Sequence, residues 1–256
     1  MGLPGELVIY PTAGEATARL ARDLAAYLRE RLAMTVPVHL ALSGGSSAVL
    51  LGTALADPTI LPASDWANLH LWMVDERCVP PQDPQLNFAL LRDTLINRVP
   101  IAPTHVHPMP VLDPDGAVKY EAELQRALAV RTPAGERRLD AVVLGMGPDG
   151  HTASLFPESP ALDERQRLIV FNDGDKVTKP RPRMTMTYPL LNRARFIALL
   201  VTGASKQQAL RAVAAKAGDF HALPVAGIAP SADARLCWYV DRAAWPHDTG
   251  ATSMSD

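Results

Sequence analysis

The feature that most constrains the fold is an alternation of short apolar runs with longer segments of helical periodicity. The apolar runs, rich in β-branched residues, occupy positions 6–10, 38–42, 69–74, 139–144, 167–171, 196–202 and 235–240. Segments with apolar residues at helical spacing lie at 14–34, 48–55, 87–96, 116–130 and 206–217. This order is typical of an α/β protein with a mostly parallel sheet and helices on both faces, which is the fold class that we predict.

The chain of 256 residues is long enough for one large domain or two small ones. A proline-rich stretch at 100–114 has the composition of a domain boundary, but the alternation continues unchanged on both sides of it. We therefore predict a single domain over residues 1–246 and a polar, disordered tail at residues 247–256.

The composition argues against several classes of partner. Lys and Arg total 25 and Asp and Glu total 27, so the chain lacks the basic excess that binds nucleic-acid phosphates. No apolar run approaches the ~20 residues that cross a bilayer. Cys78 and Cys237 form no Cys-x-x-Cys motif and are expected to be reduced thiols. We predict a cytoplasmic protein with no nucleic-acid or membrane partner, either a monomer or a weak homodimer.

The first candidate site is Ser43-Gly44-Gly45-Ser46-Ser47, which follows a predicted strand. Ligands of open parallel sheets bind beyond the carboxyl ends of the strands. Paired glycines let an anion approach the backbone, and the N–H groups of the next helix favour negative charge. A phosphate site is one interpretation, and a glycine-rich turn with a serine N-cap is the other. No Gly-Lys-Ser or Gly-Lys-Thr follows, so the marker of a nucleoside triphosphate site is missing.

The second candidate is Asp75-Glu76-Arg77, a polar loop after the run at 69–74. Acids and an arginine at the end of a strand suit a general acid or base next to a guanidinium that binds a phosphate or an oxyanion. The alternative is a solvated charge cluster or an ion-pair network.

The third candidate, residues 145–150, fits the Gly-x-Gly-x-x-Gly pattern of dinucleotide sites, and Asp173 lies near the offset expected for the acid of such a site. A dinucleotide site also needs a long helix directly after the glycines. Pro157 ends any helix there after six residues, so we expect no nucleotide at this place. We also expect no other cofactor.

The same segment places Asp149 two residues before His151. A carboxylate that accepts the proton of one imidazole nitrogen raises the basicity of the other, which suits a base that activates water. The alternative is a histidine that only caps the loop. His105 and His107 lack neighbouring acids or thiols, and neither His-Glu-x-x-His nor Gly-x-Ser-x-Gly occurs, so we expect no metal and no covalent serine catalysis.

Several of these segments carry a resemblance when they are taken together. They are Ser43-Gly44-Gly45-Ser46, Asp75-Glu76-Arg77-Cys78-Val79-Pro80 with Asp83 and Asn87, the run Leu-Gly-Met-Gly-Pro-Asp-Gly-His-Thr-Ala-Ser-Leu-Phe-Pro at 144–157, and Arg183-Met184-Thr185-Met186-Thr187. In this order they resemble the 6-phosphogluconolactonases of the glucosamine-6-phosphate isomerase/6-phosphogluconolactonase family.

The resemblance implies a Rossmann-like α/β domain without a bound nucleotide. It also implies hydrolysis of 6-phospho-D-glucono-1,5-lactone to 6-phospho-D-gluconate in the oxidative pentose phosphate pathway. The alternatives are a glucosamine-6-phosphate deaminase/isomerase and a non-catalytic sugar-phosphate sensor. The Thr-Ala-Ser-Leu-Phe-Pro run after His151, and Val79-Pro80 after Arg77, resemble the lactonase branch, whereas the deaminase branch is expected to show Asp-Glu-Tyr and Asn-Glu-Pro.

The resemblance implies a catalytic role for His151, Asp149, Arg77 and Asp75, with a small sugar-phosphate lactone as the substrate. In the hypothesis, His151, oriented by Asp149, takes a proton from water that attacks C1 and returns it to the ring oxygen. The residues expected to bind substrate are Ser43, Gly44, Gly45, Ser46, Asn87, Lys179 and Arg183.

The division of the anion-binding groups is left open by the sequence. The oxyanion is expected to meet either backbone N–H groups of Gly44 and Gly45 or the Arg77 guanidinium. Lys179 and Arg183 are the first choice for the phosphate, with Arg77 and the segment 43–46 as alternatives.

Overall fold

Seven strands form one parallel sheet in the order β1-β10-β9-β6-β2-β3-β5, in a computed structural model that describes residues 2–129, 137–173 and 182–245. The strands are β1 (Glu6–Tyr10), β2 (Val38–Leu42), β3 (Leu69–Met73), β5 (Val106–His107), β6 (Ala141–Gly145), β9 (Phe196–Val201) and β10 (Arg235–Asp241). Every residue of β2 and β9 is buried, as expected for strands covered on both faces. The predicted parallel α/β sheet is confirmed.

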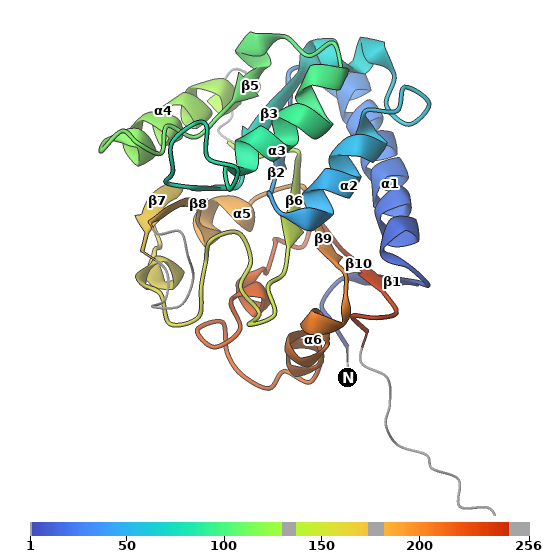
Figure 1. Cartoon of the computed structure of the whole chain (residues 1–256), viewed down its shortest axis with the longest axis vertical. Helices are drawn as coiled ribbons and strands as arrows, with labels where there is room; N and C mark the ends of the chain where they lie inside the picture. The colour runs from blue at the N-terminus through green and yellow to red at the C-terminus, as the bar shows by residue number, and fades with distance from the viewer. Residues whose placement is uncertain (1, 130–136, 174–181, 246–256) are drawn as a thin grey trace, which may run out of the picture.

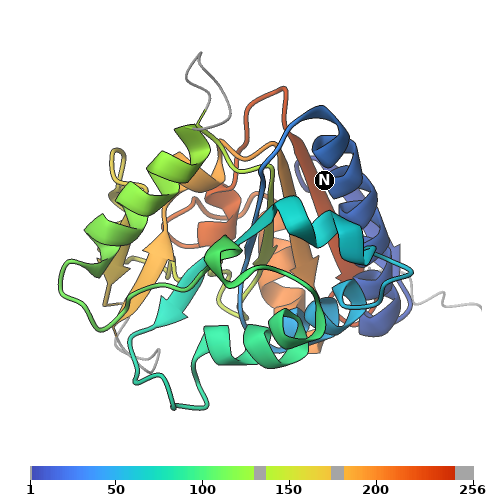
Figure 2. The ribbon, with the colours of Figure 1, turned by 90° about the horizontal axis from the view of Figure 1, so that it is seen from above.

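Helices cover both faces of this sheet (Figures 1 and 2). Figure 1 shows α1 (Ala13–Met34), α2 (Ser46–Leu55) and α3 (Asn87–Thr94) on one side, and α4 (Gly116–Ala129) and α5 (Tyr188–Leu191) on the other. The sixth α-helix, α6 (Gln207–Ala214), follows β9. Short 3₁₀ turns are η1 (Ala63–Asn68), η2 (Ile96–Arg98), η3 (Pro103–His105), η4 (Pro160–Asp163), η5 (Ala204–Lys206) and η6 (Pro224–Gly227). No helix in the described ranges has the length and apolar character needed to cross a membrane.

A second, antiparallel sheet lies beside the first and was not predicted. It contains β4 (Asp75–Arg77), β8 (Arg183–Met186) and β7 (Ile169–Asn172), in the order β4-β8-β7. The sequence predicts a loop at residues 75–77, and this prediction is wrong. They form a strand because the segment 183–185 pairs with them and satisfies their backbone groups, although their polar side chains give no strand signal.

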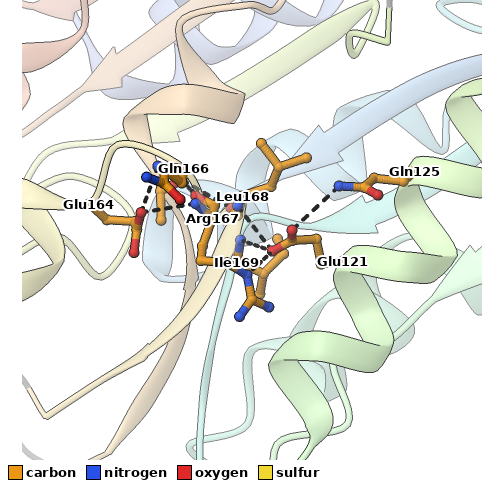
Figure 3. A network of polar contacts seen from close by, with 8 residues as sticks. Glu121, Gln125, Glu164, Gln166, Arg167, Leu168 and Ile169 are labelled. Atoms are coloured by element: carbon orange, nitrogen blue, oxygen red, sulfur yellow. Dashed lines mark hydrogen bonds and ion pairs between the residues drawn. The ribbon is translucent and has the colours of Figure 1, made fainter.

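Figure 3 shows how α4 is joined to the start of β7. The Glu121 carboxylate on α4 accepts hydrogen bonds from the Arg167 guanidinium at 3.0 Å and from the backbone N–H groups of Leu168 and Ile169 at 3.0 and 3.2 Å. The Glu121 side chain is 13% exposed, so water replaces these contacts poorly. One carboxylate therefore anchors a helix to the small sheet.

The predicted tail at 247–256 and Lys179 lie outside the described residues.

We expect Glu121→Ala to lower the free energy of unfolding by about 2 kcal/mol, because two backbone N–H groups and a guanidinium lose a charged acceptor. Urea denaturation measures the change. Glu30→Ala, on the exposed face of α1, is the control and should change stability by less than ~0.5 kcal/mol. Equal stability of the two variants would contradict this role of Glu121.

A histidine cluster lies at the β3–β5 edge of the large sheet. The rings of His70 and His105 stack with centroids 4.2 Å apart, and those of Trp72 and His107 at 3.7 Å. His107 Nδ1 lies 2.5 Å from Glu123 Oε1, and His107 Nε2 lies 2.9 Å from His70 Nδ1. If the Glu123 carboxylate accepts the Nδ1–H of His107, the unprotonated Nε2 of His107 accepts the Nδ1–H of His70, which is the arrangement of a neutral His107 ring.

Burial, together with His105 and His107, lowers the pKa of His70 to about 4 from its ordinary 6.5. The unfolded chain therefore binds this proton at higher pH than the folded chain, and stability should fall as pH falls from 6.5 toward 4. We expect His70→Phe, which keeps a stacked ring but cannot be protonated, to make this dependence shallower. Urea midpoints measured across that pH interval test it, and an unchanged slope would refute the assignment.

Candidate active site

One cavity of about 250 Å³ lies at the carboxyl ends of β2, β6 and β9, where the sequence analysis expected ligands to bind. Its volume is just below the ~300–1,000 Å³ of typical small-molecule pockets, so it fits a sugar-sized ligand better than a dinucleotide. The predicted site residues that line it are Ser43, Gly44, Gly45, Asp75, Arg77, Asn87, His151 and Arg183.

The glycine segment after β2 forms one wall of this cavity. A side-chain carbon on Gly44 would lie 2.0 Å from the Asn87 amide carbon, so only glycine fits there. Gly45 has φ of 93°, a conformation that favours glycine, and it is the N-cap residue of α2. The serine-capped turn, the alternative for this segment, is not found, because the cap position has no side chain. The first-turn N–H groups of α2 therefore lack a side-chain cap next to the cavity.

His151 and Asp149 form the pair that the sequence predicted. His151 Nδ1 lies 2.6 Å from Asp149 Oδ1, and the same oxygen accepts the backbone N–H of His151 at 3.2 Å. Burial raises the pKa of Asp149, but the hydrogen bonds from His151 outweigh it and leave the pKa below its ordinary value. An ionised Asp149 accepts the Nδ1–H of His151, which leaves Nε2 free to accept a proton. The imidazole is 30% exposed and lines the cavity.

Two glycines of the segment 145–150, Gly147 and Gly150, shape the backbone around this pair. A side-chain carbon on Gly147 would lie 2.1 Å from His151 Nδ1 and 2.5 Å from Asp149 Oδ1. Gly150 has φ of 81°, and its N–H donates to the Gly147 carbonyl at 3.1 Å. Residues 151–156 form turns and an isolated bridge rather than a helix, so the helix of a dinucleotide site is missing at this place, as the prolines predicted.

Three cationic side chains line the cavity, and one of them was missed. Arg77 donates through Nη1 to the Gln85 carbonyl at 2.5 Å. Arg183 is 5% exposed, and burial and the nearby Arg77 lower the pKa of its guanidinium, with Asp75 acting in the opposite direction. Lys206 is the missed residue. Burial lowers its pKa, and the negative charge of Asp149 opposes this.

The signal for Lys206 was its position. It follows the predicted strand at 196–202 by four residues, at the edge of the sheet where ligands bind, but the same position also suits the start of the helix that the sequence predicts at 206–217. Ser47 Oγ lies 3.3 Å from Thr202 Oγ1, so the N-terminus of α2 is next to the segment that carries Lys206.

Neutral and acidic groups also line the cavity, next to the glycine segment. Asn87 donates through Nδ2 to the Asp75 carbonyl at 3.1 Å, while Asp75 itself is 6% exposed. Three buried polar atoms of the lining, Ser43 Oγ, Asn87 Oδ1 and Arg77 Nε, have no hydrogen-bond partner among the described residues. Buried polar atoms are normally paired, so this lining suits a ligand with several hydroxyl or phosphate oxygens.

Glu76 lies between Asp75 and Arg77, which line the cavity, but its own carboxylate binds backbone N–H groups. Its carboxylate accepts the N–H groups of Arg77, Asn87 and Phe88, each at 2.7 Å. Burial raises the pKa of Glu76 to about 7, although these three donors lower it. Because side chains alternate along a strand, Asp75 and Arg77 line the cavity while Glu76 fixes the start of α3 and hence Asn87.

Two predicted binding residues are not placed. Lys179 lies outside the described residues, and so does the side chain of Ser46, the first residue of α2. Within the described ranges, no group of three or more His, Cys, Asp or Glu side chains is arranged to hold a metal ion.

The chain is similar to known proteins over most of its length. The family described as glucosamine-6-phosphate isomerases/6-phosphogluconolactonase matches residues 11–238. The GDH/6PGL endoplasmic bifunctional protein of Homo sapiens is 38% identical over 235 residues, which are 89% of this chain but span only 28% of that protein. A 6-phosphogluconolactonase of Nostoc sp. is 39% identical over 208 residues, 80% of this chain and 82% of the relative.

A crystal structure of 6-phosphogluconolactonase from Thermotoga maritima superposes with a TM-score of 0.77 at 25% identity, covering 93% of this chain and 99% of that one. The shared fold therefore agrees with a family match that spans most of the sequence. The chain belongs to the glucosamine-6-phosphate isomerase/6-phosphogluconolactonase family.

Proposed function

We propose that this protein hydrolyses 6-phospho-D-glucono-1,5-lactone to 6-phospho-D-gluconate, the lactone-opening step of the oxidative pentose phosphate pathway. The observation that carries the proposal is the His151 imidazole, which is hydrogen-bonded to Asp149 and lines a sugar-sized cavity together with Arg77, Arg183 and Lys206. A base and several cations are what hydrolysis of a phosphorylated ester requires. The names of the Nostoc and Thermotoga relatives support the same activity.

In the proposed mechanism, His151 Nε2 takes a proton from a water molecule as the water oxygen bonds to C1 of the lactone. Asp149 keeps the ring in the tautomer with Nδ1 protonated and stabilises the imidazolium that forms. The tetrahedral intermediate then collapses, the bond between C1 and the ring oxygen breaks, and the imidazolium returns the proton to that oxygen. The product has a free hydroxyl at the former ring oxygen and a carboxylic acid at C1. The carboxylic acid ionises at neutral pH.

In the proposed complex, the charge of each cavity wall determines which part of the substrate it binds. The phosphate binds at the N-terminus of α2 with Lys206, because the N–H groups there favour an anion and the contact between Ser47 and Thr202 holds Lys206 nearby. Arg183, the register partner of Arg77 in the small sheet, adds positive charge to the wall that Arg77 lines. Asp75 and Asn87 accept hydroxyl groups of the sugar, since a carboxylate repels a phosphate. The Arg77 guanidinium is the donor proposed for the oxyanion at C1.

We also propose that the protein acts in the cytoplasm. Cys78 and Cys237 are free thiols, and thiols stay reduced in that compartment. A monomeric or weakly dimeric state stays a prediction.

We expect His151→Ala to lower kcat for the lactone by the ~10²–10⁴-fold that a general base typically contributes. Acid release from freshly prepared lactone, corrected for spontaneous hydrolysis, measures the rate. His221→Ala, a histidine outside the cavity lining, should leave kcat unchanged. Undiminished turnover by the His151 variant would refute the mechanism.

Tight binding of 6-phosphogluconate by a wild-type protein without activity would favour a sensor, and ammonia release from glucosamine 6-phosphate would favour a deaminase.

We expect Lys206→Ala to raise KM for the phosphorylated lactone by roughly 10–100-fold, the loss of one hydrogen bond to a charged group. KM for glucono-1,5-lactone, which has no phosphate, should not change. Lys119→Ala, an exposed lysine on α4, is the matched control and should alter neither value. Equal effects of Lys206→Ala on both lactones would show that Lys206 does not bind the phosphate.

A further inference from the structure

We infer that Ser154 is a positioning residue that fixes the Asp75 carboxylate for binding of the sugar hydroxyl groups. The inference rests on the proposed function, because it takes Asp75 as part of the substrate site. Ser154 does not line the cavity, so it acts only through Asp75.

The hydroxyl of Ser154 is committed to this carboxylate. Ser154 is fully buried, and its Oγ donates to Asp75 Oδ2 at 2.6 Å, a short distance typical of a hydroxyl bonded to an ionised acceptor. No other hydrogen bond to the carboxylate oxygens of Asp75 is found among the described residues. One oxygen is therefore held by Ser154, and the other remains available at the cavity wall.

Ser154 is itself held on both sides of its backbone. Its N–H donates to Thr185 Oγ1 at 3.1 Å, and its carbonyl accepts from Asn172 Nδ2 at 2.8 Å. With Asp75 on β4, Thr185 on β8 and Asn172 on β7, Ser154 contacts all three strands of the small sheet. A hydroxyl fixed in this way restricts the rotation of the carboxylate that it contacts.

The need for such restraint follows from the charges near Asp75. Arg183 is close enough for its positive charge to interact with Asp75, and Arg77 lies two residues along the same strand. An ion pair between this carboxylate and a guanidinium would compete with the substrate for Asp75. The bond from Ser154 keeps Asp75 directed to the sugar.

The same short segment carries the base. Ser154 follows His151 by three residues, and Ala153 between them has φ of 51°, a left-handed conformation that is strained for alanine. Thr152 Oγ1 donates to the Gly145 carbonyl at 2.8 Å on one side of Ala153, and Ser154 is anchored on the other side. This turn places His151 in the cavity and directs Ser154 away from it, so one segment sets both the base and the hydroxyl-binding acid.

The test compares Ser154→Ala with Ser159→Ala in steady-state lactone hydrolysis. Ser159 is a matched control, because it is also a buried serine whose hydroxyl accepts from Asn172, at 3.1 Å, but it does not touch Asp75. Since the contact of Asp75 with a sugar hydroxyl exists in both ground and transition states, we expect Ser154→Ala to raise KM by roughly 10–100-fold with little change in kcat. Ser159→Ala should change neither constant, and Ser154→Cys, a weaker donor, should give an intermediate KM.

Two results would overturn the inference. An unchanged KM in Ser154→Ala would show a merely structural role, and a lower kcat at constant KM would show that the variant disturbs His151 instead. A double-mutant cycle adds a second readout: in an Asp75→Ala background, Ser154→Ala should have no further effect on KM, whereas additive effects would refute action through Asp75.

The proposed function and this inference fail in different ways. If the wild-type protein does not hydrolyse the lactone, the proposed function fails, and calorimetric binding of 6-phosphogluconate replaces KM in the same comparison. A wild-type affinity that falls in Ser154→Ala but not in Ser159→Ala would then still support the positioning role, and equal affinities would overturn it. If the wild-type protein is active and KM does not respond to Ser154→Ala, only the inference fails.

Discussion

The site depends on the backbone of Val74, where the chain leaves one sheet and enters the other. The Val74 N–H donates to the Leu42 carbonyl at 3.0 Å, which continues the pairing of β3 with β2, and its carbonyl accepts the Met186 N–H at 2.8 Å, which begins the pairing of β4 with β8. Buried backbone N–H and C=O groups both need hydrogen-bond partners, and those of Val74 find them in different sheets, so this residue is shared by the two sheets. The shared residue brings Asp75 and Arg77 next to the glycine segment after β2.

Close packing of glycine backbone against functional side chains sets the geometry of the cavity. Gly44 lies against the Asn87 amide and Gly147 lies against the imidazole of His151, and in both places a side-chain carbon would overlap the neighbour. These glycines therefore act by allowing another residue to occupy the space. A pattern such as Gly-x-Gly-x-x-Gly indicates that some group packs closely against the backbone, but it does not indicate which group. The same pattern therefore fits both a dinucleotide loop and a histidine loop.

The parts of the fold that local physics determines were predictable. The strand Val38–Leu42 is apolar at nearly every position because both faces are buried, and its bounds match the prediction. The pairing of Asp149 with His151 was predictable because both residues belong to one tight turn. The strand at residues 75–77 was not, because its partner lies about a hundred residues away in sequence and its own side chains are polar. Lys206 was missed for a similar reason, since a single lysine before a helix has the same local pattern as a solvent-exposed one.

The two sheets also explain why polar contacts, rather than apolar packing alone, hold the site together. The glycine segment and the His151 loop extend from the large sheet, whereas Asp75, Arg77 and Arg183 belong to the small one. Apolar packing between two layers tolerates small shifts, because dispersion contacts have little directionality. Hydrogen bonds do not tolerate such shifts, and the bonds of Thr152 to Gly145 and of Ser154 to Asp75 span the two layers within three residues. The distance between His151 and Asp75 across the cavity is thus set by directional contacts on both sides of Ala153, and these contacts hold the left-handed conformation of that residue in place.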